Sequence, residues 1–128
     1  MITFVPHPGT VLVCDFDALG FREPMMRKKR RVVVVQRRVR DHRPTTILVV
    51  PLSTTPPLLG RPWHHRIPAG KYGYLSATQD VFVKGDMVCA VPISALDRLN
   101  LNGAWIAPAL PPIEYLAIQN AVREAMAI

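Results

Sequence analysis

The segment RVVVVQRR, residues 31–38, places four consecutive valines between arginine and glutamine side chains. β-branched residues favour extended backbone, and an uninterrupted apolar run of this length is typical of a strand buried on both faces. We therefore predict a central strand over 31–38 and interpret its neighbours as the rest of one sheet.

Short segments of similar character lie on both sides of this run. We expect further strands at 10–16, 45–52, 63–68, 86–93 and 104–107, and prolines on both sides of 63–68 indicate an edge strand there. Thirteen prolines in 128 residues favour such short strands over long helices. Between the first two strands, residues 17–30 are expected to form a long polar loop.

Two helices are expected near the end of the chain. Ser94 and Asp97 have the spacing of a capping box, which predicts a short helix at that point. A longer helix is expected over 113–127, after two prolines that suit a first helical turn. Its apolar face is predicted to pack on the barrel and consists of Ile113, Leu116, Ala117, Ala121, Ala125 and Met126. Five or six short strands and this helix predict a mainly β fold, a small curled barrel in a single domain.

The positive charge of the chain is concentrated in one region. Residues 22–43 carry ten basic and two acidic side chains, whereas the remainder carries six basic and seven acidic ones, so the whole net charge of +7 originates there. Such a concentration attracts a polyanion, and arginine suits phosphate because its planar guanidinium binds two oxygens at once. The alternative interpretation is a solvated loop that only improves solubility.

Several functional classes are disfavoured by what the sequence lacks. Cys14 and Cys89 lie in apolar runs, which predicts buried thiols in a reducing cytoplasm. The cysteines and histidines do not have the spacing of a metal site, so we expect neither a metal nor another cofactor. The first residues do not resemble a signal peptide, and no apolar window is long enough to cross a membrane, so a cytoplasmic location without a membrane partner is expected.

Several segments, taken in order, resemble the MazF/PemK/Kid toxins of type II toxin–antitoxin systems. They are PGTVLVCDF at 8–16, KRRVVVV at 29–35, VVPLST at 49–54, WHHRI at 63–67, KGDMV at 84–88 and SALDRL at 94–99. The resemblance covers nearly the whole chain. It implies one PemK/MazF-like domain over 1–128, with an SH3-like (CcdB/MazF-like) barrel at about 8–107 and the helix at about 112–127.

The same resemblance implies a function. Members of the family are homodimeric endoribonucleases that cleave single-stranded mRNA without metal, and a cognate antitoxin protein neutralises them. In metal-independent cleavage the 2′-oxygen attacks the adjacent phosphorus, the 5′-oxygen leaves, and a 2′,3′-cyclic phosphate remains. Donors that stabilise the charge developing on the phosphate usually contribute the largest rate effect.

The catalytic residues are carried over from the resemblance. Aligning the family's Arg-Pro-(Val)n segment on the valines makes Arg30 the catalytic arginine, with Arg31 in place of the family's proline; a shift of one position would select Arg31 instead. Ser53, at a strand end, is expected to hold the scissile phosphate, with Thr54 as the alternate. His64 is a further candidate as an acid or base, although strand alternation allows only one of His64 and His65 to face a site.

Other side chains near the basic segment are candidates for RNA binding. We expect RNA contacts from Phe21, by base stacking, and from Arg22, Arg27, Lys28, Lys29 and Arg37. Trp63 is interpreted as an anchor of the edge strand rather than a stacking platform. Asp86 is interpreted as a turn residue rather than a partner that orients the arginine.

Two other functions remain open at this stage. A CcdB-like gyrase poison has the same fold but depends on an aromatic residue near its C-terminus, whereas this chain ends in AMAI, residues 125–128. A non-catalytic RNA-binding SH3-like barrel is the second alternative, because Arg31 departs from the family's proline.

Overall fold

The computed structural model describes residues 2–20, 28–35 and 46–127. Within them the strands are β1 (Val11–Asp15), β2 (Lys29–Val34), β3 (Thr46–Ser53), β4 (His64–Ile67), β5 (Val81–Lys84), β6 (Cys89–Pro92), β7 (Leu96–Asp97), β8 (Leu99–Leu101) and β9 (Ala104–Ile106). Two short 3-10 turns, η1 (Gly85–Met87) and η2 (Ile93–Ala95), and one helix, α1 (Pro112–Met126), complete the fold. The prediction of a mainly β chain with a C-terminal helix is confirmed.

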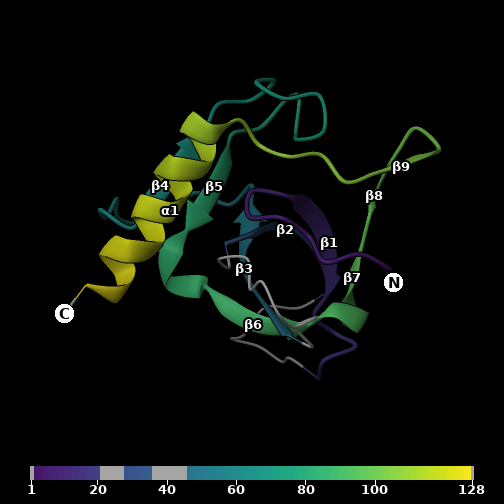
Figure 1. Cartoon of the computed structure of the whole chain (residues 1–128). Helices are drawn as coiled ribbons and strands as arrows, with labels where there is room; N and C mark the ends of the chain where they lie inside the picture. The colour runs from purple at the N-terminus through teal and green to yellow at the C-terminus, as the bar shows by residue number, and fades with distance from the viewer. Residues whose placement is uncertain (1, 21–27, 36–45, 128) are drawn as a thin grey trace.

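Strand β3 organises the sheet because both of its edges are paired. One edge pairs with β2, and the other pairs with β6 along 46–49 and with β5 at its last two residues. The order β4-β5-β3-β2-β1-β7 is antiparallel throughout. Since β6 continues through η2 into β7, which pairs with β1, the strands β1, β2, β3, β6 and β7 curl into the ring seen in Figure 1.

The valine run separates two cores. Val32 and Val34 face a cluster inside the ring with Leu12, Phe16 and Leu96. Val33 faces the opposite side, where Val50 and Val83 of neighbouring strands pack with Ile118 of α1. All three valines are at most 1% exposed, so the predicted burial on both faces is confirmed. The predicted strands at 10–16, 45–52, 63–68 and 104–107 correspond to β1, β3, β4 and β9, and β4 lies at the end of the sheet order as expected for an edge strand.

Several boundaries differ from the sequence predictions. β2 begins at Lys29 rather than Arg31, because Lys29 and Arg30 pair with Asp15 and Cys14 of β1 instead of ending a loop. The predicted strand over 86–93 begins only at Cys89, since residues 85–87 form η1, and β5 just before it was not predicted. The predicted helix at Ser94 is wrong: η2 starts at Ile93, and after one turn the chain extends to pair with β1.

The face of α1 that packs on the sheet was predicted only in part, since Ala121 is buried as expected but three other predicted residues are not. Its buried residues are Glu114, Ile118, Ala121 and Val122, whereas Ile113, Leu116 and Met126 are exposed. The helix is turned by two close contacts: Glu114 reaches a polar cluster described below, and the backbone at Ala121 lies directly over Gly85. A Cβ at Gly85 would lie 2.4 Å from the Ala121 carbonyl oxygen, so only glycine fits there.

Both cysteines are free thiols. Cys14 is buried inside the ring and Cys89 is half-buried. Burial raises the pKa of the Cys14 thiol to about 12. In the described part of the chain, α1 is the one α-helix, and it is too short and too polar to cross a membrane.

Candidate active site

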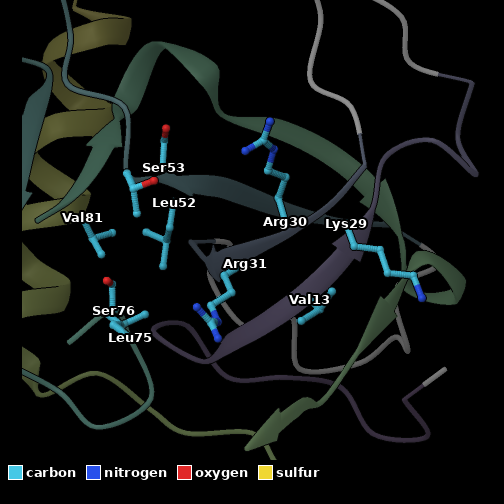
Figure 2. A pocket seen from close by; sticks show the side chains of 10 residues that line it. Val13, Lys29, Arg30, Arg31, Leu52, Ser53, Leu75, Ser76 and Val81 are labelled. Atoms are coloured by element: carbon cyan, nitrogen blue, oxygen red, sulfur yellow. The ribbon is translucent and has the colours of Figure 1, made fainter. Parts of the chain in front are cut away.

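A gap opens in the sheet where β2 and β3 separate. Their pairing ends at Val32 opposite Pro51, and the next residues of β3, Leu52 and Ser53, pair only with β5 on the other edge. A pocket of about 340 Å³ occupies this gap (Figure 2). It is lined by Val13, Lys29, Arg30, Arg31, Leu52, Ser53, Thr54, Leu75, Ser76 and Val81.

Three consecutive cationic side chains of β2 form one wall of the pocket. Lys29, Arg30 and Arg31 are all exposed, although their backbone is held by pairing with β1. Strand alternation sends Arg30 to the inner face of the ring and Arg31 to the outer face, and Figure 2 shows the two guanidinium groups pointing to opposite sides of β2. The wall therefore presents positive charge on both sides of one strand.

Ser53 stands across the gap from Arg30. Continuing the register of Val32 opposite Pro51 by two residues brings Arg30 opposite Ser53, and residues opposite each other in antiparallel strands share a face. The Ser53 Oγ accepts a hydrogen bond from the Thr55 backbone N–H at 3.0 Å, which fixes the hydroxyl at the end of the strand. Its own proton can still be donated to a ligand oxygen.

The polar side chains of the pocket carry positive charge or hydroxyl groups, and the remaining lining residues are apolar. No carboxylate or imidazole is found among its lining residues. In the described part of the chain, no group of three histidine, cysteine or acidic residues is arranged to hold a metal ion. Guanidinium and hydroxyl donors on facing walls match the non-bridging oxygens of a phosphate diester, which is an anion and an acceptor.

The predicted site residues fall into three groups. Lys29, Arg30, Arg31, Ser53 and Thr54 come together in the pocket. Lys28 immediately precedes β2 with a left-handed backbone (φ 64°), and its backbone N–H donates to Asp17 Oδ1 at 2.8 Å; its side chain does not line the pocket. Phe21, Arg22, Arg27 and Arg37 lie outside the described residues.

His64 lies on the edge strand, away from the pocket lining. Its Nδ1 accepts a hydrogen bond from the Arg61 backbone N–H at 3.2 Å, and its ring meets that of Trp63 edge to face. Trp63 is half-buried, and Asp86 is exposed in η1. The position of Asp86 agrees with its interpretation as a turn residue.

Five lining residues were not anticipated, and two of them are Val13 of β1 and Leu52 of β3. Leu75, Ser76 and Val81 come from the connection between β4 and β5 and from the start of β5. The Ser76 Oγ accepts hydrogen bonds from the backbone N–H groups of Thr78 and Gln79, at 3.3 and 3.0 Å. The sequence signal for this turn is the run SATQD at 76–80, in which small and polar residues separate two apolar segments.

A second polar cluster fastens α1 to the sheet. The buried Glu114 carboxylate accepts hydrogen bonds from Tyr72 Oη and Lys71 Nζ, each at 2.8 Å, and also contacts His65 Nε2. Burial by itself raises the pKa of Glu114, but the hydrogen bonds from Lys71, His65 and Tyr72 outweigh it and lower the pKa below the usual value. Burial, together with the bond to Glu114, raises the pKa of Tyr72 to about 12. Because His65 contacts Glu114 of α1, its ring faces the helix and does not line the pocket.

Comparison with known proteins gives one family and a consistent fold. The sequence profile of the PemK-like, MazF-like toxins of type II toxin–antitoxin systems matches residues 7–125. No curated protein sequence matches the chain.

Solved structures of similar fold include an endoribonuclease bound to its cognate antitoxin from a mycobacterial species (19% identity, 97% of each chain, TM-score 0.65). The Mycobacterium tuberculosis toxin MazF-mt6 is 19% identical over 93% of this chain and 97% of its own, with a TM-score of 0.61. MazE–MazF from Deinococcus radiodurans is 12% identical over 98% of each chain, with a TM-score of 0.64. These likenesses confirm the predicted MazF-like fold.

Proposed function

The chain belongs to the PemK-like, MazF-like toxins of type II toxin–antitoxin systems, and from this membership we propose that it is an endoribonuclease acting on single-stranded RNA. We place the reaction in the pocket between β2 and β3. The observation that supports the proposal is that Arg30 and Ser53 line one pocket whose charged side chains are all cationic.

The chemistry follows from the groups present. The 2′-hydroxyl of the ribose gives its proton to water and its oxygen attacks the neighbouring phosphorus, the bond from phosphorus to the 5′-oxygen breaks, and that oxygen takes up a proton from water. The products are a 2′,3′-cyclic phosphate and a free 5′-hydroxyl. Charge accumulates on the non-bridging oxygens as the phosphorus becomes five-coordinate, and guanidinium and hydroxyl donors that already face this position stabilise it without rearrangement.

We assign the main catalytic role to Arg30. It shares its face of the sheet with Ser53, so the guanidinium and the hydroxyl can bind the same phosphate from two sides. Ser53 donates to a non-bridging oxygen, and the exposed Thr54 is the alternate hydroxyl donor. Arg31, on the opposite face beside Leu52, is placed to hold the neighbouring part of the RNA and is the alternate catalytic arginine. His64 has no part in the proposed reaction, since it does not line the pocket.

Binding of the RNA beyond the cleaved phosphate is assigned to the basic segment. Lys28 and Lys29 adjoin the pocket at the start of β2, and Phe21, Arg22, Arg27 and Arg37 remain proposed RNA contacts from the same part of the sequence. As partners we propose a second copy of this chain and a cognate antitoxin, in keeping with the antitoxin complexes among the similar structures. A cytoplasmic location fits this proposal, because mRNA is the substrate.

One experiment separates the ribonuclease from the two other functions. Purified protein is incubated with a mixed single-stranded RNA in excess EDTA, and the products are analysed for 2′,3′-cyclic phosphate ends. Cleavage with such ends supports the proposal. RNA that is bound but remains intact identifies a non-catalytic RNA-binding barrel, and inhibition of gyrase with intact RNA identifies a gyrase poison; either result overturns it.

A further inference from the structure

A second pocket adjoins the first one across β1. Its volume is about 370 Å³, and it shares Val13 and Lys29 with the pocket between β2 and β3. Its other lining residues are Asp15, Ala18, Ser94, Ala95, Leu96, Asp97, Arg98, Asn100 and Trp105. The shared residues lie on one face of β1 and β2, so the two pockets follow one another across the ends of these strands. A single strand of RNA that occupies the first pocket can continue into the second.

A tight hairpin holds an exposed tryptophan at the far side of this second pocket. The turn between β8 and β9 consists of Asn102 and Gly103, whose φ angles of 51° and 89° are those of the two central residues of a type I′ turn. In the hairpin, Trp105 lies directly opposite Asn100. The indole is 60% exposed and makes no ring contact with another described aromatic residue. An aromatic plane fixed in this way, and open to solvent, is a platform for stacking a nucleobase.

The charges of the second pocket favour a base over a phosphate. Lys29 and Arg98 are balanced by Asp15 and Asp97, in contrast to the purely cationic first pocket. Asp97 is ionised at neutral pH, because the backbone hydrogen bond from Arg98 lowers its pKa. The two carboxylates repel a phosphate but accept hydrogen bonds from the N–H groups of a base.

The border between the two pockets carries an opposite-charge pair. Asp15 of β1 lies directly opposite Lys29 of β2, so the carboxylate and the ammonium group stand on the same face. Asp15 Oδ1 accepts a hydrogen bond from the Ala18 backbone N–H at 3.1 Å, which fixes the carboxylate. Across the pocket, Asn100 Oδ1 accepts from the Gly103 backbone N–H at 2.9 Å, and within the described part of the chain its amide NH₂ has no partner.

We propose that this second pocket binds the nucleobase next to the cleaved phosphate and selects guanine. The inference rests on the proposed ribonuclease function. Guanine presents adjacent N1–H and N2–H donors that the Asp15 carboxylate accepts together, and its O6 accepts from the Asn100 amide or from Lys29. The ring stacks on Trp105. Adenine has neither the N1–H donor nor the O6 acceptor, and a pyrimidine covers less of the indole.

The test reads the base preference of the enzyme at every position around the cleaved bond. A random single-stranded RNA pool is digested in EDTA, and the new ends are sequenced for the wild type and for Trp105→Ala, Trp105→Phe and Asp15→Asn. Asp15→Asn keeps an oxygen for the Ala18 N–H but removes the second acceptor that guanine needs. Leu58→Ala, which alters a fully exposed apolar side chain elsewhere, is the control.

We expect the wild type to enrich guanine at one position adjoining the cleaved bond. Trp105→Ala should flatten the preference at that position alone and lower cleavage of guanine-containing sites roughly 5- to 150-fold, the loss expected for one stacked base. Trp105→Phe should retain most of the activity, and Asp15→Asn should accept adenine nearly as well as guanine. Leu58→Ala should match the wild type.

The outcomes distinguish this inference from the proposed function. If the wild type does not cleave RNA, the ribonuclease proposal itself fails. If it cleaves but the profiles of the wild type and Trp105→Ala coincide, the second pocket does not bind a base. If Trp105→Ala instead converts a dimer into a monomer, as measured by light scattering, the indole belongs to an interface between copies of the chain and the inference is overturned.

Discussion

A Cβ placed on Gly85 would lie 2.4 Å from the carbonyl oxygen of Ala121, so the turn after β5 and the middle of α1 touch backbone to backbone. Backbone atoms cannot move aside to make room for a Cβ as easily as the end of a flexible side chain can. We therefore expect Gly85→Ala to lower the free energy of unfolding by about 1–3 kcal/mol, the usual cost of overpacking, or more. Urea denaturation measures this loss. Gly73→Ala is the matched control, because nothing lies within 4 Å of its added Cβ, and an equal effect of both substitutions would contradict the argument.

The two arginines in the pocket are expected to behave differently. Arg30→Ala should lower kcat about 10²- to 10³-fold with little change in stability, because it removes a donor aimed at the developing phosphate charge. Arg31→Ala should mainly raise KM, since Arg31 points to the other side of β2. Single-turnover cleavage of RNA separates the two effects. Arg123→Ala, on the exposed side of α1, should leave both constants unchanged. A large fall in kcat for Arg31→Ala alone would identify Arg31 as the catalytic arginine.

The hydroxyl of Ser53 is expected to matter more than that of Thr54. Ser53 continues the register opposite Arg30, whereas Thr54 is exposed beyond the end of β3. Ser53→Ala should therefore reduce kcat by about 10²- to 10³-fold, the range for one lost donor to a transition state, and Thr54→Ala should reduce it less. Thermal unfolding of both variants controls for the lost bond to the Thr55 N–H. The reverse order of effects would transfer the role to Thr54.

Binding of RNA is expected to weaken as salt is added. Each phosphate that a lysine or arginine neutralises on single-stranded RNA contributes about −0.7 to the slope of log affinity against log salt. Lys29→Ala should therefore make the slope shallower by about that amount, measured by fluorescence anisotropy with a non-cleavable 2′-deoxy or 2′-O-methyl oligonucleotide. Arg123→Ala should not change it. A slope near zero for the wild type would show that the cations of β2 do not contact phosphate.

The buried Glu114 should make stability depend on pH in the acid range. Because hydrogen bonds in the folded protein lower its pKa, the folded state favours the ionised form. Its contribution is complete above the ordinary value of 4.5 and is lost as the pH falls from there through the lowered pKa of the folded state. Glu114→Gln should be less stable at pH 7 by about 1–3 kcal/mol and should lose less on acidification. Urea midpoints at pH 7 and pH 4 check this, with the exposed Glu124→Gln as control.

The sequence predicted the structure correctly where the local residue pattern alone determines which side chains are buried. The four valines alternate between two cores, and this double burial is what a continuous β-branched run predicts. The resemblance selected Arg30 through the valine run and Ser53 through the segment VVPLST, and the structure brings both residues into one pocket. Contacts between distant segments were not predictable in this way. The apolar spacing of α1 indicated Ile113 and Leu116 as its packing face, whereas a carboxylate bond at Glu114 and the glycine at 85 determine which side turns inward.

Some signals in the sequence were present but not used. The Asn102–Gly103 pair is a strong indicator of a two-residue hairpin, and it would have placed Trp105 opposite Asn100. The pocket residues Leu75 and Ser76 come from a connection with no regular periodicity. Their position depends on how β5 pairs with β3, and this long-range contact cannot be predicted from local sequence.

The double pairing of β3 links catalysis to the integrity of the whole barrel. Its last residues form one wall of the reaction pocket, while its preceding residues contribute to both cores and pair with β2 and β6. Amide protons along 47–52 should therefore exchange only through cooperative opening of the entire molecule, with no partly unfolded form in which the pocket alone is lost. We therefore expect an inhibitor of this protein to cover the pocket rather than to unfold it locally.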